Sequence, residues 1–316
     1  MHIGLIYPIS SNGLNAGEFT NKFSLHAISG ISKNETGVAI AGVATVIKEN
    51  AKGVQISGVA NVIGESADGV QVAGFMNIIR HNAKGLPVAG FLNLSESAGP
   101  AQIAGFSNIT RESVKGVQIA GFLNKSKDVN SQISGFVNLA KKVKGVQIAG
   151  LINIADSSDY PIALLNFIKN GEKSVGITVD ETATTIASFR SGGRVLYGIL
   201  GVGYNFKSGN KSLYGLEAGL GAHIPVAEKL RVNAELANLV LTDFKRGDYF
   251  KNTLRILPTF RLAENLEIFA GPSLNFVKYS RDKGDDLISH YLWKQRNTKD
   301  FTGLYLGFNV GVQYIF

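Results

Sequence analysis

The chain has 316 residues and a formal net charge of +8 at pH 7, with 45% hydrophobic residues, 37 glycines and no cysteine. The lack of cysteine excludes a disulfide framework, thiolate metal sites and a cysteine nucleophile. No stretch approaches the roughly 18 to 20 apolar residues of a membrane-spanning helix, and Lys and Arg are scattered, unlike the stripe typical of a nucleic-acid-binding surface. Abundant Phe, Tyr, Val and Ile, together with Gly, predict an all-β chain.

The N-terminal segment carries two stretches with strand periodicity. Residues 2–8 and 22–31 are predicted to be the first two strands of a β-barrel, so residues 1–32 are assigned to that barrel. Met1 leads into this segment without the basic region, apolar core and cleavage site of a secretory signal. Because an exported protein needs such a signal, we expect a mature or truncated form.

Residues 33–168 repeat a unit of 14 to 16 residues, which is clearest as Gly-Val-Gln-Ile-Ala-Gly-Phe-Leu-Asn at positions 116–124. Apolar and polar positions alternate within each unit, and charges lie almost entirely between units, as in a series of short strands. Pro87 and Thr45 interrupt the two amide columns. Gln recurs at 55, 71, 102, 118, 132 and 147, and Asn at 61, 77, 93, 108, 124, 138 and 153.

A unit this short cannot bury its own apolar face, so the copies must stack. Stacking in register would place Gln on Gln and Asn on Asn, and we therefore predict a β-solenoid. An antiparallel meander of single strands is the alternative, and it would widen the barrel to 16 or more strands. Residues 34–158 contain no Tyr or Trp, which argues against a membrane crossing by the repeats, because membrane strands carry aromatic girdles.

The repeats, together with Tyr-Pro-Ile-Ala-Leu-Leu-Asn-Phe at positions 160–167, resemble a bacterial surface-repeat family built on Gly-Leu-Gln-Ile-Gly-Leu-Val-Asn units. The resemblance implies a bacterial surface location and supplies no mechanism. The Asn column could form a glycan-binding row, but internal hydrogen-bonded ladders are the favoured interpretation.

Residues 169–193 are predicted to be a connecting β segment, and residues 194–316 to supply the remaining barrel strands. Long alternating stretches there place apolar side chains on one face and polar ones on the other, as lipid and a polar interior require. The predicted fold is thus a transmembrane antiparallel barrel of about eight strands, with the repeat module inserted between the second and third. The C-terminal strands are predicted at 195–206, 212–225, 229–242, 252–262, 265–279 and 302–316.

The last six residues, Gly-Val-Gln-Tyr-Ile-Phe ending at Phe316, resemble the C-terminal signal of bacterial outer-membrane barrels. The resemblance implies a bacterial outer-membrane location, a lipid environment and recognition by the barrel-assembly machinery. If both chain ends face the periplasm, the turns near Ala227 and Ala263 and the whole repeat segment lie on the periplasmic side. Segments 9–21, 207–211, 243–251 and 280–301 are then expected outside.

Two groups of residues are candidate sites. Six charged residues on the polar face of the predicted strands are expected to pair inside the barrel and plug it. The segment 280–301 and its flank carry three aromatic residues suited to a protein or glycan partner, or equally to anchoring at the membrane interface. The first group is Glu217, Arg231, Glu235, Arg255, Arg261 and Glu267, and the second is Tyr279, Tyr291 and Trp293.

Other motifs carry weaker signals. Residues 203–212 resemble a phosphate-binding loop interrupted by Asn210, and a hairpin turn is favoured there. The cluster Asp282, Asp285 and Asp286 lacks calcium-loop spacing, and the five histidines show no metal-ligand spacing. We therefore expect no cofactor, no nucleic-acid partner and no enzymatic activity. The leading hypothesis is an outer-membrane anchor that carries a scaffold or binding module. A transport pore is the alternative, and a membrane lipid hydrolase is a weaker third.

Overall fold

The computed structural model describes residues 1–207, 213–245, 249–280, 284–297 and 300–316. These residues form two compact units, Met1–Asp156 and Ser157–Phe316. Both are built almost entirely of strands, apart from one 3-10 turn, η1 (Gly13–Glu18). No helix in the described residues is long and apolar enough to cross a membrane.

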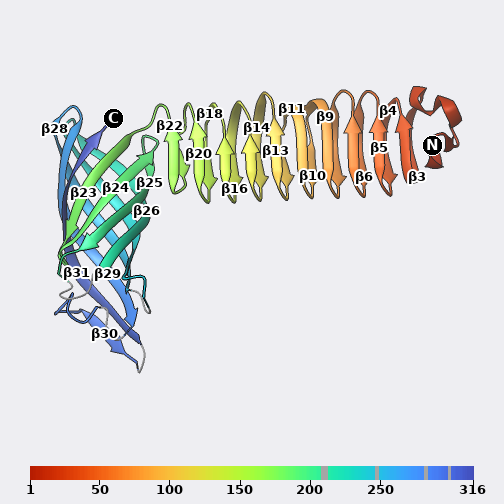
Figure 1. The fold of residues 1–316 in the computed structure, drawn as a ribbon. Helices are drawn as coiled ribbons and strands as arrows, with labels where there is room; N and C mark the ends of the chain where they lie inside the picture. The colour runs from red at the N-terminus through yellow and green to blue at the C-terminus, as the bar shows by residue number, and fades with distance from the viewer. Residues whose placement is uncertain (208–212, 246–248, 281–283, 298–299) are drawn as a thin grey trace. The chain divides into compact units, whose positions relative to one another are not determined.

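The first unit is a parallel β-solenoid (Figure 1). It begins with β1 (His2–Ile6), β2 (Ile9–Ser10) and β3 (Thr20–Ser32), in which β1 pairs parallel with β3. The strands that follow are β4 (Asn34–Ala41), β5 (Ala44–Ile47), β6 (Ala51–Ser57), β7 (Ala60–Ile63), β8 (Ala67–Ala73), β9 (Met76–Ala83), β10 (Leu86–Ala89), β11 (Leu92–Ala98), β12 (Ala101–Ala104), β13 (Ser107–Thr110), β14 (Ser113–Ala120), β15 (Leu123–Lys125), β16 (Asp128–Ser134), β17 (Val137–Leu139), β18 (Lys142–Val143), β19 (Val146–Ala149) and β20 (Ile152–Ala155).

Equivalent residues of successive coils lie side by side. Gln55 of β6 pairs with Gln71 of β8, and Asn61 of β7 pairs with Asn77 of β9. Each coil contributes two strands, one before and one after its Gly-containing turn. The strands before the turns form one parallel ladder, and the strands after the turns form a second. This pairing confirms the β-solenoid and contradicts the antiparallel meander.

The Gly column is explained by backbone contact between coils. A Cβ on Gly58 would lie 2.0 Å from the carbonyl oxygen of Gly42, and one on Gly121 would lie 2.2 Å from that of Gly105. Real Cβ atoms do not approach oxygens this closely, so any side chain would force the coils apart at this turn.

The amide columns form internal ladders of opposite direction. Asn93 Nδ2 donates to Asn108 Oδ1 at 2.9 Å, toward the C-terminus, whereas Gln118 Nε2 donates to Gln102 Oε1 at 2.9 Å, toward the N-terminus. Asn93 Nδ2 also donates to the Ile103 carbonyl at 2.7 Å. These side chains are 0 to 1% exposed, so they satisfy one another inside the coil and cannot form a glycan-binding row.

Residues 1–32 belong to the solenoid, so their assignment to the first two barrel strands is wrong. In β3, Ser24 pairs with Ala39 of β4, and Ser29 pairs with Ala44 of β5, which makes β3 a first coil. This coil carries Ser, Ala and Gly where later coils carry Gln, Gly and Asn, so the repeat pattern is absent from its sequence. The segment 9–21, expected outside a membrane, contains β2 and η1 of the same unit.

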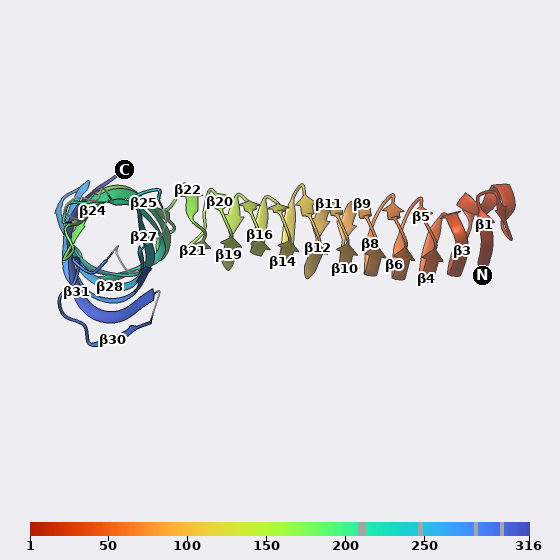
Figure 2. The same ribbon diagram turned by 60° about the horizontal axis from the view of Figure 1, so that its bottom comes forward.

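The second unit is an eight-stranded antiparallel barrel, counted over its described residues, and Figure 2 looks into the closed ring. Closure comes from β23 pairing with β31, for example Ile177 with Val312. Two short strands, β21 (Tyr160–Ile162) and β22 (Leu165–Ile168), precede the barrel. Its strands are β23 (Lys173–Asp180), β24 (Thr184–Gly192), β25 (Leu196–Asn205), β26 (Leu213–Ala227), β27 (Leu230–Thr242), β28 (Tyr249–Ala263), β29 (Leu266–Ser280) and β31 (Asp300–Ile315), and β30 (Trp293–Arg296) pairs with β31 only.

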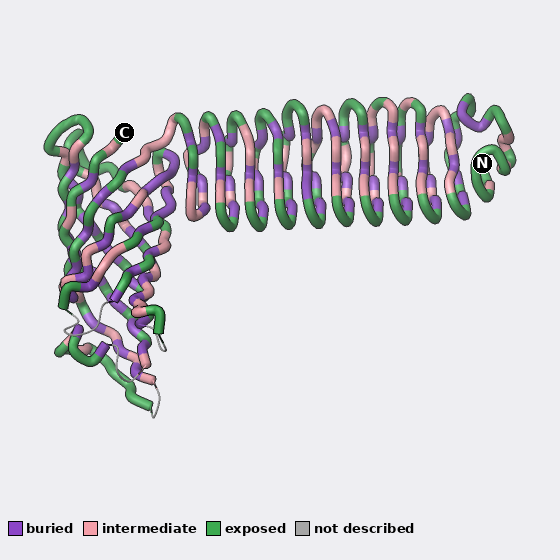
Figure 3. The backbone as a smooth tube through the Cα atoms, viewed as in Figure 1, coloured by how far each residue is buried: buried purple, intermediate pink, exposed green. Residues whose placement is uncertain are grey.

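The barrel and the eight-strand count agree with the sequence-based expectation, but two of the strands come from other residues. β23 and β24 lie in the segment 169–193, which was assigned as a connector, and together with β25 they complete the ring. The repeats therefore precede the barrel and are not inserted into it, and they do not widen it to 16 strands. The alternation of burial along β28 and β29 agrees with the predicted inner and outer faces (Figure 3).

The two barrel ends differ. At one end lie the start of β23, the short connections near Arg194, Ala227 and Ala263, and Phe316. At the other end lie the longer connections 206–212, 243–248 and 281–299, of which 208–212, 246–248, 281–283 and 298–299 are outside the described residues. We refer to these as the short-turn end and the long-loop end.

Candidate functional site

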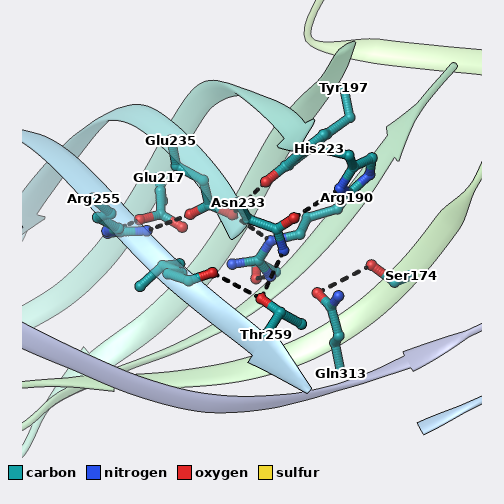
Figure 4. A network of polar contacts seen from close by, with 12 residues as sticks. Ser174, Arg190, Tyr197, Glu217, His223, Asn233, Glu235, Arg255, Thr259 and Gln313 are labelled. Carbon is teal, nitrogen blue, oxygen red and sulfur yellow. Dashed lines mark hydrogen bonds and ion pairs between the residues drawn. The ribbon is translucent and has the colours of Figure 1, made fainter. Parts of the chain in front are cut away.

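The centre of the barrel holds a buried cluster of ion pairs (Figure 4). Arg255 on β28 contacts Glu217 of β26, and its Nη1 lies 3.4 Å from Glu235 Oε2 of β27. Arg190 of β24 donates from Nε to Glu235 Oε1 at 2.9 Å, and the Tyr197 hydroxyl donates to the same oxygen at 3.0 Å. Two carboxylates thus face two guanidiniums, so the cluster is electrically neutral.

Burial of these charges is nearly complete, with side-chain exposures between 0 and 3% for Arg190, Glu217, Glu235 and Arg255. Charges held away from water in this way are tolerated only when they are paired. The Tyr197 ring is accommodated because Gly221 of β26 lies against it: a Cβ on Gly221 would be 2.2 Å from the ring.

A second cluster lies toward the short-turn end. Arg231 donates from Nη1 and Nη2 to the two carboxylate oxygens of Glu172, at 2.8 and 2.6 Å, and from Nη2 to Glu267 Oε2 at 2.6 Å. Arg261 also donates to Glu267, at 3.1 Å. Burial acts to raise the pKa of Glu172, but the hydrogen bond and charge of Arg231 outweigh it and hold that pKa below its ordinary value.

A third cluster lies toward the long-loop end. Lys251 of β28 pairs with Asp180 of β23, and both side chains are at most 5% exposed. Asp180 Oδ1 also accepts from the Thr182 hydroxyl at 2.6 Å and from the Thr184 amide at 3.1 Å. These bonds hold the β23–β24 turn against the barrel interior.

The structure brings the six predicted lumen residues together as two groups. Arg255, Glu217 and Glu235 belong to the central cluster, and Arg231, Arg261 and Glu267 to the cluster at the short-turn end. Sequence periodicity did not identify Arg190, Asp180, Glu172 and Lys251 as interior residues. The first three lie in the segment taken as a connector, and Lys251 lies one residue before the predicted start of its strand. Strand alternation extended backward from Arg255 would have identified Lys251.

The aromatic group assigned to the surface is mostly internal. Tyr279 is 2% exposed and lies 5.4 Å from the Tyr249 ring and 4.7 Å from the Phe301 ring. Tyr291 is half-buried beside Phe301, at 5.0 Å. Together with Leu239, Leu241 and Leu287 these rings fill the interior toward the long-loop end.

Trp293 is the member of the predicted group that stays at the surface. It is 48% exposed and lies on β30, paired with Leu304 of β31. β30 therefore pairs with the edge of β31 beyond the end of β23, and the interior rings of Tyr279 and Tyr291 cannot serve as a contact surface.

The weaker motifs do not assemble into a site. Gly203 and Tyr204 of the suspected phosphate loop lie within β25, and 208–212 are outside the described residues. Asp285 accepts hydrogen bonds from Tyr279 and Arg296, while Asp282 is outside the described residues. Over the part of the chain that is described, no group of three or more His, Asp or Glu is placed to hold a metal ion.

No protein-family model and no curated protein matches the chain. Among solved structures, a chain titled "De novo design of transmembrane beta-barrels" matches with 18% sequence identity and a TM-score of 0.27, over 46% of this chain and 93% of that one. A likeness this weak adds nothing to the fold or to the function argued from the residues.

Proposed function

We propose that the second unit spans a bacterial outer membrane as a closed, non-conducting and non-enzymatic anchor, and that the repeats form the scaffold or binding module it holds. The observation that carries this proposal is the inverted polarity of the barrel: charges are paired inside, and apolar side chains cover the outside. Outward Leu216, Leu236, Leu254 and Leu306 are 47 to 66% exposed, while Arg255 and Glu235 are inside. A water-soluble barrel has the opposite arrangement.

The dimensions of six of the eight barrel strands suit a bilayer crossing. β25 to β29 and β31 have 10 to 16 residues, and about 9 to 11 tilted residues cross a hydrocarbon core. The pairing of β23 with β31 closes the ring, which removes the two free edges of an open sheet and supports a spanning role.

Exposed aromatic side chains lie near both ends of the barrel, as membrane-interface girdles do. Outward Asn238 of β27 and Asn252 of β28 interrupt the apolar surface, and they hydrogen-bond to each other at 3.0 Å, which lowers the cost of facing lipid. The aromatic residues are Phe206, Tyr214, Phe244 and Phe250 near the long-loop end, and Phe260, Tyr314 and Phe316 near the short-turn end.

The filled interior favours an anchor over a pore. Neutral ion-pair clusters and an apolar cluster occupy the space inside the ring, and the repeats add no strands that would widen it. In planar bilayers we expect the purified full chain to give no conductance steps, while a porin inserted under the same conditions gives them. Reproducible single-channel steps from the full chain would overturn the anchor proposal and favour a channel.

The resemblance of the last six residues to an outer-membrane signal supports assembly by the barrel-assembly machinery. Phe316 is 61% exposed, and its amide donates to the Lys173 carbonyl at 3.0 Å, so the C-terminal strand is complete only once the barrel has closed. We propose that Trp293, exposed at the long-loop end, contacts a protein or glycan partner.

A further inference from the structure

The outer surface of the solenoid is apolar along one edge. Outward positions of the strands on both sides of the Gly-containing turns carry Val, Ile, Leu, Ala or Met, with Ser107, Lys125 and Ser131 as exceptions. The second residue of each turn is also apolar. We call this surface the apolar belt; its turn residues are Val43, Val59, Phe75, Phe91, Phe106, Phe122, Phe136 and Leu151.

The centre of the belt is a row of stacked rings. Phe75, Phe91, Phe106, Phe122 and Phe136 follow one another at centroid distances of 4.8, 4.7, 4.9 and 5.1 Å. Each of them is 37 to 47% exposed. The rings contact one another along the solenoid and leave their outer edges open.

The belt is larger than a soluble protein usually exposes. Eight coils at about 4.8 Å spacing, with four strand residues of about 3.3 Å on each side of the turn, give an outer surface of roughly 900 Å². The largest apolar patch of a typical soluble monomer is about 300 to 600 Å². The height of the belt, about 13 Å, is close to half of the roughly 30 Å hydrocarbon core of a bilayer.

The backbone of this edge is satisfied internally, which entry into hydrocarbon requires. The Phe122 and Leu123 amides donate to the Phe106 carbonyl at 2.9 and 3.1 Å, and the Phe91 and Leu92 amides donate to Phe75 in the same way. The amide side chains of Gln and Asn point inward into their ladders. The backbone of the belt can therefore leave water without exposing unpaired polar groups.

On the face that precedes the turns, the margin of the belt is mainly cationic. On the strands that precede the turns, the position two residues before the belt is Lys52, Lys84, Lys115 or Lys144 in four coils and Asp68 in a fifth. These lysines are exposed and lie at the height where lipid headgroups would begin. On the other face, Lys125 lies in the last belt row, and the residues beyond it carry both signs, with Lys127 paired to Glu112 at 2.7 Å.

We propose that the apolar belt inserts into one leaflet of a membrane that contains anionic phospholipid, with the lysine margin at the headgroups. The belt height matches one leaflet, the paired backbone permits the insertion, and the margin charge complements anionic lipid. This inference concerns the repeats alone and does not depend on the barrel spanning a membrane.

The absence of native cysteine permits a site-specific test in the full chain. Single-cysteine variants Phe122→Cys in the belt, Asp128→Cys on the charged side of the following coil and Leu236→Cys on the barrel exterior are labelled with an environment-sensitive fluorophore. Each is reconstituted into vesicles of phosphatidylcholine with phosphatidylglycerol, with and without lipids carrying a quencher on the acyl chain.

We expect the label at 122 to be quenched by these lipids to a similar degree as the label at 236, and the label at 128 not to be quenched. Quenching at 236 without quenching at 122 would overturn belt insertion while leaving the barrel proposal intact. A label at 122 that is shielded from water but unquenched, with energy transfer between chains, would mean that a second copy covers the belt and would also overturn the proposal.

The lysine margin is tested separately with the combined variant K52E/K84E/K115E/K144E in the Phe122→Cys background. In the parent, quenching at 122 should increase with the phosphatidylglycerol fraction, and in the variant this increase should disappear. An unchanged dependence on lipid charge would overturn the role of the margin. Circular dichroism of both proteins checks that the solenoid is folded.

Discussion

At the scale of single residues, the barrel interior is organised by pairing. Strand alternation was sufficient to predict that Glu217, Glu235 and Arg255 face inward. Each of them occupies a polar position in its strand, and both of its sequence neighbours are apolar. It could not predict which charges meet, since pairing between β24 and β27 across the interior depends on the size and tilt of the ring. Arg190, which bonds Glu235 at 2.9 Å, is therefore known only from the structure.

Removing the central guanidinium should be costly. Arg255→Met leaves Glu217 without its ion-pair partner in a buried site, and we expect a loss of about 3 to 5 kcal/mol in unfolding free energy. Arg261→Met is the matched control, because Arg261 is 39% exposed and Glu267 keeps Arg231; its loss should be at most about 1 kcal/mol. Urea unfolding of the barrel in lipid micelles measures both, and equal losses would contradict the buried-pair account.

Removing one member of the Asn ladder should destabilise the solenoid. Asn108→Ala removes buried hydrogen bonds to the Ile119 carbonyl, at 2.8 Å, and to Asn124, at 3.0 Å, and should destabilise the solenoid by about 2 to 4 kcal/mol. The exposed Asn130→Ala should change it by less than about 0.5 kcal/mol. Chemical unfolding followed by circular dichroism distinguishes them, and a neutral Asn108→Ala would show that the ladder is dispensable.

At the scale of elements, periodicity identified most coils but not the first, and it identified β25 to β29 and β31 but not β23, β24 or β30. Apolar and polar residues alternate both in a coil strand and in a membrane strand. Because β3 lacks the Gln and Asn columns of the repeats, Phe23 and Leu25 were consistent with the lipid-facing side of a barrel strand. β23 and β24 have only 8 and 9 residues, and the outer face of β24 includes Thr185 and Ala187, so the apolar alternation in this segment was short.

Replacing a turn glycine by a residue with a side chain should destabilise the solenoid. Gly105→Ala places a Cβ about 2.1 Å from the Gly90 carbonyl oxygen, so the coils must separate, and we expect a loss of about 3 kcal/mol or more. Ala27 occupies the equivalent position in the first coil, and Ala27→Gly should cost about 1 kcal/mol or less. Thermal unfolding of the full chain checks both; a Gly105→Ala solenoid as stable as the parent would refute the contact.

The first coil should respond to pH. Burial and the nearby His2 ring, at 4.4 Å, lower the pKa of His26 to about 4 from 6.5. Between these values the unfolded coil binds more protons than the folded one, so its stability should rise as pH rises from about 4 to 6.5. Burial raises the pKa of Glu35. This shift lowers the stability of the folded coil as the pH rises above the ordinary pKa of a glutamate, and it is present both in the parent and in a variant that lacks His26.

Hydrogen exchange of residues 20–32, corrected for intrinsic rates, should therefore show weaker protection at pH 4.5 than at pH 7 in the parent. His26→Gln should lessen that difference. The same pH dependence in the variant would assign the effect to another group.

At the scale of the whole molecule, an even strand number makes the chain enter and leave the barrel at one end. β23 begins at the short-turn end, and Phe316 also lies there. In the usual outer-membrane orientation this is the periplasmic end. The sequence-based expectation placed the repeats on that side by counting two wrong strands before them, whereas in the structure no strand of the barrel precedes them.

We propose that the eight-stranded barrel, spanning an outer membrane, leaves the repeats on the periplasmic side. A protease-cleavable tag at Glu65–Ser66 in a repeat turn tests it, with the same tag at Asp243–Phe244 at the long-loop end as the control. We predict cleavage at 243–244 in intact cells, and cleavage at 65–66 only after the outer membrane is permeabilised. Cleavage at 65–66 in intact cells would contradict the proposed orientation.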